Sequence, residues 1–338
     1  MLKNSIEKLM QKQNLSNQTI IDAFDAMLAP DANSLQTAAF LALLRAKTET
    51  SEELAAMVAV LQQKMIAVPT EHTVLDIVGT GGDGAQTINI STGSAILAAS
   101  CGVKIAKHGN RAVSSLAGSA DVLEALGIKI DLSPQKINAC IDEVGIGFCF
   151  SPNFHPALYQ LRTLRKTLNI PTSFNLLGPL LNPTQPAHLL LGVFAENLLM
   201  PMADTLQKIG AKHSMVVHGQ TLDEISCIGP IKVIEITKNT LKELVIDPKT
   251  FGFAYCHLSD LQGSDAKTNA KILLDTFANT STKKNQAISH TLILNAAYAL
   301  YLYGLHTSIF DALSHAKENL YNGRALTLLK NWIEFSHD

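Results

Sequence analysis

The sequence predicts an α/β protein in which a small all-helical N-terminal domain precedes a larger α/β domain with a mainly parallel central sheet flanked by helices. Three observations lead to this prediction. Residues 1 to about 66 carry amphipathic helical patterns and no strand pattern. From Thr73 onward, short apolar strands alternate with helical segments, which is typical of a parallel sheet covered on both faces. A length of 338 residues, with 47% hydrophobic and 17% charged residues, favours two folded domains over a disordered chain.

Helix-start signals recur along the first segment. Ser16, Ser34 and Ser51 each precede a run of helix-forming residues and are predicted N-caps. Two acidic residues, Glu52 and Glu53, directly follow the third serine, where the positive end of a helix favours negative charge. We therefore expect a helical domain over residues 1–70.

The second domain is predicted from strands and helices in alternation. The expected strands cover residues 74–79, 103–108, 146–150, 188–194, 214–218 and 231–237, and helices are expected at 91–100 and 120–126. Residues 155–181 are helical again and interrupt this alternation, so we interpret a segment at about 155–183 as an insert that joins the helical domain. Residues 71–154 and 184–338 then form the α/β domain, which ends with helices expected near 289–304, 308–321 and 323–336.

Composition excludes several classes of protein. A net charge of −2 provides no overall electrostatic footprint for nucleic acid. The five cysteines are odd in number and scattered, with no Cys-x-x-Cys, which favours reduced buried thiols over a disulfide framework or a zinc ribbon. The first residues lack a signal-peptide pattern, and the longest apolar run, around 297–302, is too short to span a bilayer. We expect a soluble cytoplasmic protein without nucleic-acid or membrane partners.

A glycine-rich segment follows the first predicted strand. Glycines 79, 81 and 84 fit G-x-G-x-x-G, but no helix begins in the loop, and Lys104 stands about twenty residues on, where a ribose-binding acid is expected in a dinucleotide site. No Gly-Lys-Ser/Thr follows, so the Walker pattern does not fit either. Four glycines within residues 79–84 instead predict a nest of backbone N–H groups for phosphate oxygens; the alternative is a structural turn.

Two further segments carry anion-binding residue types. Asn89–Gly93 opens a predicted helix, and the hydroxyls of Ser91 and Thr92 with the helix N-terminus form an expected anion site, although simple N-capping fits the spacing equally well. Lys107–Arg111 follows the second strand, at the edge of a parallel sheet where ligands bind in open α/β folds. A solvated charged loop is the alternative for this second segment.

Adjacent acidic residues, Asp223 and Glu224, follow a strand that ends at His218. Taken alone, such a pair is usually an ordinary surface feature. Beside two phosphate-binding loops, the same pair is suited to Mg²⁺ bridged to a diphosphate. The sequence therefore predicts a metal-assisted phosphate site.

Together these motifs resemble the anthranilate phosphoribosyltransferases, which are nucleoside phosphorylase-like phosphoribosyltransferases. The motifs are Gly-Thr-Gly-Gly-Asp-Gly at 79–84, Asn-Ile-Ser-Thr at 89–92, Lys-His-Gly-Asn-Arg at 107–111, Phe-Asn-Leu-Leu-Gly-Pro-Leu-Leu-Asn-Pro at 174–183 and Asp-Glu at 223–224. The resemblance extends over the whole chain. It implies magnesium-dependent transfer of phosphoribose from 5-phosphoribosyl 1-diphosphate to anthranilate, a step of tryptophan biosynthesis that yields N-(5-phosphoribosyl)anthranilate and diphosphate.

The resemblance also implies site residues. Those expected to bind phosphoribosyl diphosphate are Gly79, Gly82, Asp83, Thr87, Asn89, Ile90, Ser91, Thr92, Lys107, His108, Gly109, Asn110, Arg111, Ala112, Val113, Ser114, Ser115 and Ser119. Those expected along the anthranilate site are Gly79, His108, Asn110, His155 and Arg165, and those expected to bind two Mg²⁺ ions are Ser91, Asp223 and Glu224. The resemblance implies no covalent nucleophile or dedicated base, and a homodimer formed through the helical domain.

The chain departs from the family pattern at two places, and two alternative functions remain. Leu116-Ala117 stand where the family commonly has Lys-Ser, and Pro171 stands where it often has Arg, which puts a diphosphate contact and the packing of the insert in question. One alternative is a pyrimidine nucleoside phosphorylase, which does not require a metal-bound diphosphate. The other is a non-catalytic nucleic-acid-binding paralogue of the same fold, which the acidic total and the metal and diphosphate residues disfavour.

Overall fold

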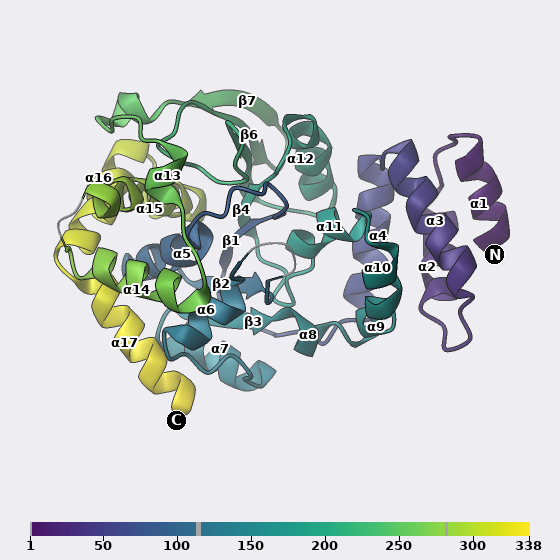
Figure 1. Cartoon of the computed structure of the whole chain (residues 1–338), viewed down its shortest axis with the longest axis horizontal. Helices are drawn as coiled ribbons and strands as arrows, with labels where there is room; N and C mark the ends of the chain where they lie inside the picture. The colour runs from purple at the N-terminus through teal and green to yellow at the C-terminus, as the bar shows by residue number, and fades with distance from the viewer. Residues whose placement is uncertain (1, 113–115, 281–282) are drawn as a thin grey trace.

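A computed structural model of the chain describes residues 2–112, 116–280 and 283–338. The N-terminal helices lie at one end of the molecule and the α/β part, with the C-terminus, at the other (Figure 1). Helices of the N-terminal part are α1 Leu2–Met10, α2 Asn17–Met27, α3 Ser34–Lys47 and α4 Ser51–Gln63. The predicted fold class, a helical domain followed by an α/β domain, is confirmed.

Within the described residues, seven strands form one sheet in the order β3-β2-β1-β4-β5-β6-β7. The strands are β1 Leu75–Gly79, β2 Ile105–Gly109, β3 Ile146–Phe150, β4 His188–Gly192, β5 His213–Gly219, β6 Ile231–Thr237 and β7 Leu241–Ile246. Pairings from β3 to β5 are parallel, whereas β6 and β7 add on antiparallel. The edge strand β7 was not predicted, because it is largely exposed and lacks an apolar alternation.

The remaining helices cover the sheet or connect its strands. They are α5 Ile90–Ser100, α6 Ser119–Ala125, α7 Pro134–Glu143, α8 Ser151–Phe154, α9 Pro156–Tyr159, α10 Arg162–Leu168, α11 Phe174–Leu177, α12 Leu199–Lys208, α13 Leu258–Leu261, α14 Ala266–Phe277, α15 Lys283–Tyr303, α16 Ile309–Tyr321 and α17 Arg324–His337, with 3-10 turns η1 Gly178–Leu180, η2 Glu196–Leu198 and η3 Pro248–Phe251. Alternate residues of the strands join two apolar clusters, one with α5 and α15 and one with α12 and the N-terminal helices. The sheet is therefore covered on both faces, as predicted.

Helix α5 is buried nearly throughout because its residues are small or apolar. A Cβ on its Gly93 would lie 2.7 Å from Leu273 and 3.0 Å from Leu292 of the covering helices, so only glycine allows this close approach. The first turn of α5 is thereby held firmly where β1 leads into its loop.

Two of the three predicted N-caps are wrong by one residue. Ser16 caps α2, as predicted, by accepting from the Thr19 N–H. Asn33, not Ser34, caps α3, and Thr50, not Ser51, caps α4 in a capping box with Glu53. Serine at the first helical position resembles an N-cap in sequence, so the spacing alone did not separate the two.

The insert between β3 and β4 consists of short helices and is not one continuous helix. Asn169 ends α10 in a left-handed conformation with φ of 49°, and Pro171 follows two residues later. Beyond it, the Ser173 hydroxyl donates to the Glu49 carboxylate at 2.5 Å, which ties the insert to the loop between α3 and α4. Helices α9 and α10 lie against the N-terminal helices in Figure 1, and their apolar residues pack on the same cluster. The domain boundaries at 70, 155 and 183 stay a prediction.

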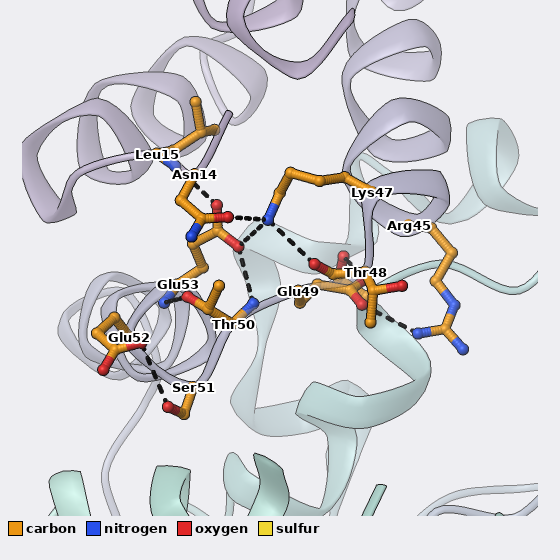
Figure 2. Close-up of polar contacts among 11 residues, drawn as sticks. Asn14, Leu15, Arg45, Lys47, Thr48, Glu49, Thr50, Ser51, Glu52 and Glu53 are labelled. Atoms are coloured by element: carbon orange, nitrogen blue, oxygen red, sulfur yellow. Dashed lines mark hydrogen bonds and ion pairs between the residues drawn. The ribbon is translucent and has the colours of Figure 1, made fainter. Parts of the chain in front are cut away.

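A buried ion pair fixes the connection between α3 and α4 (Figure 2). The Lys47 ammonium and the Glu53 carboxylate lie 2.8 Å apart, with side chains 4% and 0% exposed. Glu53 also accepts from the backbone N–H groups of Leu15 and Thr50, at 2.8 and 2.9 Å. One carboxylate thus organises two of the three loops that join the first four helices, the one between α1 and α2 and the one between α3 and α4.

Replacing Glu53 with Ala is expected to lower the unfolding free energy by about 3–5 kcal/mol, because it removes the counter-charge of a buried ammonium and the acceptor of two backbone donors. Glu52→Ala provides the matched control, since the Glu52 side chain is 60% exposed and lies in the same helical turn. Urea unfolding followed by circular dichroism measures both. Equal losses in the two variants would contradict the assigned role of Glu53.

Candidate active site

The glycine loop after β1 adopts backbone conformations that require glycine. Gly81, Gly82 and Gly84 have φ values of 65°, 86° and 69°, in the left-handed region that other residues rarely adopt. A Cβ on these three glycines would meet nothing within 4 Å, so the space around the loop is open. The loop therefore exposes its backbone at the carboxyl end of β1, where phosphate oxygens bind in such nests.

Gly79 serves a different purpose, since it admits Asp223 beneath the loop. A Cβ on Gly79 would lie 2.3 Å from Asp223 Oδ2, a distance that real Cβ contacts do not show. The same oxygen accepts from the Gly81 N–H at 2.6 Å. The structure thus brings Asp223, 142 residues away in sequence, into direct contact with the glycine loop.

Two acidic groups, Asp223 and Glu224, lie close to Asp83 of the loop itself. Burial and the nearby charge of Asp83 raise the pKa of Asp223 to about 7. Burial and the adjacent Asp223 raise the pKa of Glu224 well above its usual value, while Lys107 and the Ser91 backbone act in the opposite direction. Among the side chains that the structure describes, no lysine or arginine lies within ion-pair distance of these acids. The site is therefore suited to a cation.

The donor set fits Mg²⁺ only in part. Over the described ranges, no group of three or more His, Cys, Asp or Glu side chains is arranged to hold a metal ion. Mg²⁺ is commonly bound through one or two carboxylates together with substrate phosphates and water. Asp223 and Glu224 match that pattern, and Ser91 opens the helix beside Glu224. A metal bound here would need oxygen ligands from a substrate.

The N-terminus of α5 lies beside these acids. Asn89 is its N-cap residue but makes no side-chain cap bond; its amide instead donates to the Ala117 carbonyl at 3.1 Å and its oxygen accepts from Asn269 at 3.0 Å. The alternative of simple N-capping is therefore wrong for Asn89. The Thr92 hydroxyl is buried without a hydrogen-bond partner. Ile90 is buried. Thr87, in the extended segment before α5, forms an isolated antiparallel β-bridge with Gln262.

Lys107 is buried and reaches across the sheet edge. Its ammonium donates to the Ile77 carbonyl at 2.8 Å and to the Ser91 hydroxyl at 3.4 Å. Burial lowers its pKa, and the charges of Asp76 and Glu224 act to raise it. Lys107 therefore faces the carboxylates from the β2 side, which excludes the solvated-loop alternative for this residue.

The loop after β2 is shaped by Asp121, an acid that lies outside the sequence motifs. Asp121 accepts from the backbone N–H groups of Ala112 and Gly118, each at 2.9 Å, and from the exposed Arg111 guanidinium at 3.0 Å. The ends of the loop are thereby drawn together, and Arg111 points toward α6 and not toward the glycine loop. An acid at the first turn of a helix was the available sequence signal.

The structure describes only part of the rest of this loop. Ser119 lies against Gly109, where a Cβ would be 2.0 Å from the serine hydroxyl, and Asn110 accepts from the Arg111 N–H through its side chain at 2.8 Å. The predicted ligands Val113, Ser114 and Ser115 lie outside the described residues.

Two histidines form a buried pair at the end of β2. The His108 and His155 rings meet edge to face with centroids 5.4 Å apart, and both Nε2 atoms are buried without a partner. Burial, the other histidine and Lys107 lower the pKa of His108 to about 3, and burial lowers that of His155 to about 4. Both rings are therefore neutral at pH 7.

Arg165 lies on α10, over the ring of Phe174 at 4.9 Å from its centroid. Within the described part of the chain, no acidic side chain forms an ion pair with it. None of the hydrogen bonds in the described ranges joins its guanidinium to the histidine pair. Its position in the acceptor site stays a prediction.

Two family descriptions match the chain in succession. The description "Glycosyl transferase family, helical bundle domain" matches residues 3–65, and "Glycosyl transferase family, a/b domain" matches residues 71–326. The chain is 43% identical over 337 residues to an anthranilate phosphoribosyltransferase of Chlamydia felis, covering 99% of this chain and 97% of that protein. It is 40% identical to one of Bacillus mycoides, covering 98% and 97%.

Solved structures agree in fold over nearly the whole chain. The crystal structure of anthranilate phosphoribosyltransferase from Thermus thermophilus superposes with a TM-score of 0.92 at 33% identity, covering 99% of each chain. The enzyme from Saccharomyces cerevisiae in complex with PRPP and Mg superposes with a TM-score of 0.90 at 29% identity, covering 99% of this chain and 98% of that one. The likeness therefore extends over both the helical part and the α/β part of the chain.

Proposed function

The chain belongs to the glycosyl transferase family that joins a helical bundle domain to an a/b domain, and from this membership we propose that it transfers phosphoribose from 5-phosphoribosyl 1-diphosphate to anthranilate. The products are N-(5-phosphoribosyl)anthranilate and diphosphate. The observation that carries the proposal is the placement of Asp223 and Glu224 directly under the glycine loop, beside the start of α5.

The chain's own groups suit the departure of a diphosphate. Breaking the bond at ribose C1 develops positive charge on the sugar and negative charge on the leaving group. The open backbone of the glycine loop, the N-terminus of α5 and the Lys107 ammonium all offer positive electrostatic potential there, preorganised before the reaction. Mg²⁺ held by Asp223, Glu224 and Ser91 would neutralise further charge on the diphosphate. No residue in this set needs to act as a covalent nucleophile.

The acceptor side is proposed to include Gly79, His108, Asn110, His155 and Arg165. The two histidine rings are uncharged and lie edge to face, and each has an Nε2 atom without a hydrogen-bond partner. These properties suit an aromatic amine. Arg165 would hold the carboxylate of anthranilate through its planar fork. The nitrogen of anthranilate is uncharged and needs little activation, so its positioning carries much of the catalysis.

We extend the proposal to magnesium dependence with two ions, to a homodimer formed through the helical domain, and to a cytoplasmic location. Magnesium binding is supported by Asp223 and Glu224, which have no basic partner among the described side chains. All five cysteines are free thiols, which fits a reducing compartment. None of the helices described in the structure is long and apolar enough to cross a membrane.

The proposal is tested by incubating the protein with both substrates and isolating phosphoribosylanthranilate. A parallel incubation with uridine or thymidine and inorganic phosphate tests the nucleoside phosphorylase alternative, and DNA titration tests the nucleic-acid-binding one. The two alternatives are not favoured, since the relatives above are anthranilate phosphoribosyltransferases.

Arg165→Ala is expected to raise the KM for anthranilate by about 10- to 100-fold, the size of a lost charge-assisted hydrogen bond, and to change the KM for phosphoribosyl diphosphate by less than about threefold. Steady-state kinetics with each substrate varied in turn measures both constants. Arg162→Ala is the matched control, because Arg162 is exposed on the same helix. Equal increases in both constants would rule out the assigned role.

A further inference from the structure

Strands β1 and β2 are joined only at their beginning. Their register pairs Leu75 with Ile105 alone, whereas β1 pairs with β4 over five positions and β2 with β3 over five. Past Ile105, the backbone groups of β2 that face β1 need other partners, because buried N–H and C=O groups are costly when unpaired. The unpaired part lies at the carboxyl ends of β1 and β2, where the glycine loop and the loop after β2 begin.

Two buried side chains supply those partners. Asp76 accepts from the His108 N–H, with each carboxylate oxygen 3.3 Å from the nitrogen. The Asn182 amide donates to the Ala106 carbonyl at 2.7 Å and to the Asp76 carboxylate at 2.9 Å. The Asn182 oxygen accepts from the Thr184 N–H and hydroxyl, so the amide uses both donors and its acceptor. Asp76 and Asn182 are 0% and 2% exposed.

Lys107 spans the same opening from the other strand. Its ammonium donates to the Ile77 carbonyl, a β1 group next to Asp76. Asp76 therefore affects the backbone position of His108 directly and the position of Lys107 through the adjoining Ile77.

The segment that ends at Asn182 faces the histidine pair. The Gly178 carbonyl interacts with His108, and the Leu181 carbonyl interacts with His155. Carbonyl acceptors of this kind fix the tautomer and orientation of a neutral imidazole. Because Asn182 anchors this segment to β1 and β2, its amide indirectly sets the direction in which the two unpartnered Nε2 atoms point.

We propose that Asp76 and Asn182 are positioning residues, which hold β1 and β2 apart at their carboxyl ends and thereby set Lys107 for the diphosphate and the His108–His155 pair for the acceptor. This inference rests on the proposed function, and it assigns roles to two residues that act through others. Asn182 acts on the acceptor side, through the histidines. Asp76 acts on both substrates, since it contacts the His108 backbone and lies beside Lys107.

The kinetic test compares Asn182→Ala with Asn319→Ala. Asn319 is an equally buried asparagine that donates to the Ser100 carbonyl at the far end of α5, so its loss perturbs packing away from the site. Asn182→Ala is expected to raise the KM for anthranilate about tenfold or more while the KM for phosphoribosyl diphosphate changes less than about threefold. Asn319→Ala is expected to leave both constants unchanged. If the two variants behave alike, or if Asn182→Ala raises both constants equally, the inference is overturned.

Asp76→Asn provides a second variant should Asn182→Ala not fold. In Asp76→Asn, the amide N–H groups face the N–H donors of His108 and Asn182, which need an acceptor. Lys107 also loses a nearby negative charge. Both KM values are expected to rise about tenfold or more. Both values staying within about twofold of wild type would overturn the inference.

An activity-independent measurement separates this inference from the proposed function. Imidazole ¹⁵N spectra of histidine-labelled protein report the tautomer of each ring, and His108→Gln and His155→Gln assign the two signals. Asn182→Ala is expected to shift both signals and Asn319→Ala neither; unshifted signals in Asn182→Ala would overturn the inference. A wild-type protein without transferase activity would overturn the proposed function while leaving this spectroscopic comparison intact.

Discussion

Replacing Asp223 with Asn and Glu224 with Gln in one variant is expected to reduce kcat/KM at least about 1,000-fold at millimolar magnesium, the size of effect that loss of a preorganised charge-stabilising group produces. The two carboxylates lie under the glycine loop with no described basic side chain paired to them. Their amide counterparts keep the shape of the side chains and remove the charge that would attract Mg²⁺. Initial rates with both substrates measure the loss.

The folded state itself is expected to tolerate this change. Burial raises the pKa of both carboxyls, so their charged forms destabilise the folded state at pH 7, and neutral amides remove that cost. The thermal unfolding midpoint without magnesium should therefore not fall. Asp142→Asn with Glu143→Gln is a matched control, since it alters an Asp-Glu pair that is exposed at the end of α7. Activity retained by the Asp223/Glu224 variant at low magnesium would show that these residues are not ligands.

Replacing Gly79 with Ala is expected to reduce kcat/KM by about 100-fold, because a displacement of about 1 Å in a catalytic group has effects of this order. The added Cβ would stand 2.3 Å from Asp223 Oδ2 and 3.2 Å from its backbone oxygen, so the carboxylate must leave the Gly81 N–H. The magnesium concentration for half-maximal rate should rise as well. Rates measured across a magnesium titration test both effects.

Gly229→Ala is the control for this substitution. Its Cβ would meet the end of the flexible Gln220 side chain at 2.9 Å, which can move aside. Unchanged kinetics are expected for Gly229→Ala. If Gly79→Ala also left the magnesium dependence unchanged, the close approach of Asp223 to the loop would have no part in metal binding.

Local signals predicted much of the fold and part of the site. The strands β3 and β6 begin and end at the predicted residues, because their apolar runs are bounded by turn residues. The glycine loop was predicted from residues adjacent in sequence, and its left-handed glycines follow from that composition. The Asp223-Glu224 pair is predicted as a metal site by combination with the loops. The structure places Asp223 against the glycine loop and Glu224 beside the start of α5, and metal binding by the pair stays a prediction.

What the sequence could not supply are contacts between distant polar residues. Asn182 bonds to Asp76 over 106 positions and Ser173 to Glu49 over 124, and neither pair has a local pattern. The burial of a polar residue depends on the whole fold. The sequence therefore placed Asp76 in an apolar strand without indicating the contacts of its carboxylate. The end of α10 at Asn169 likewise depends on a left-handed residue that helix propensity does not reveal.

Magnesium-dependent transfer of phosphoribose to anthranilate at the proposed Asp223–Glu224 site is tested most directly by anthranilate fluorescence. The protein is mixed with anthranilate, phosphoribosyl diphosphate and Mg²⁺, and the fluorescence is followed with and without a chelator. The expected result is a decay that requires all three components, stops when the chelator is added and resumes when Mg²⁺ is restored. A decay that continues unchanged in excess chelator, or no decay with all components present, would contradict it.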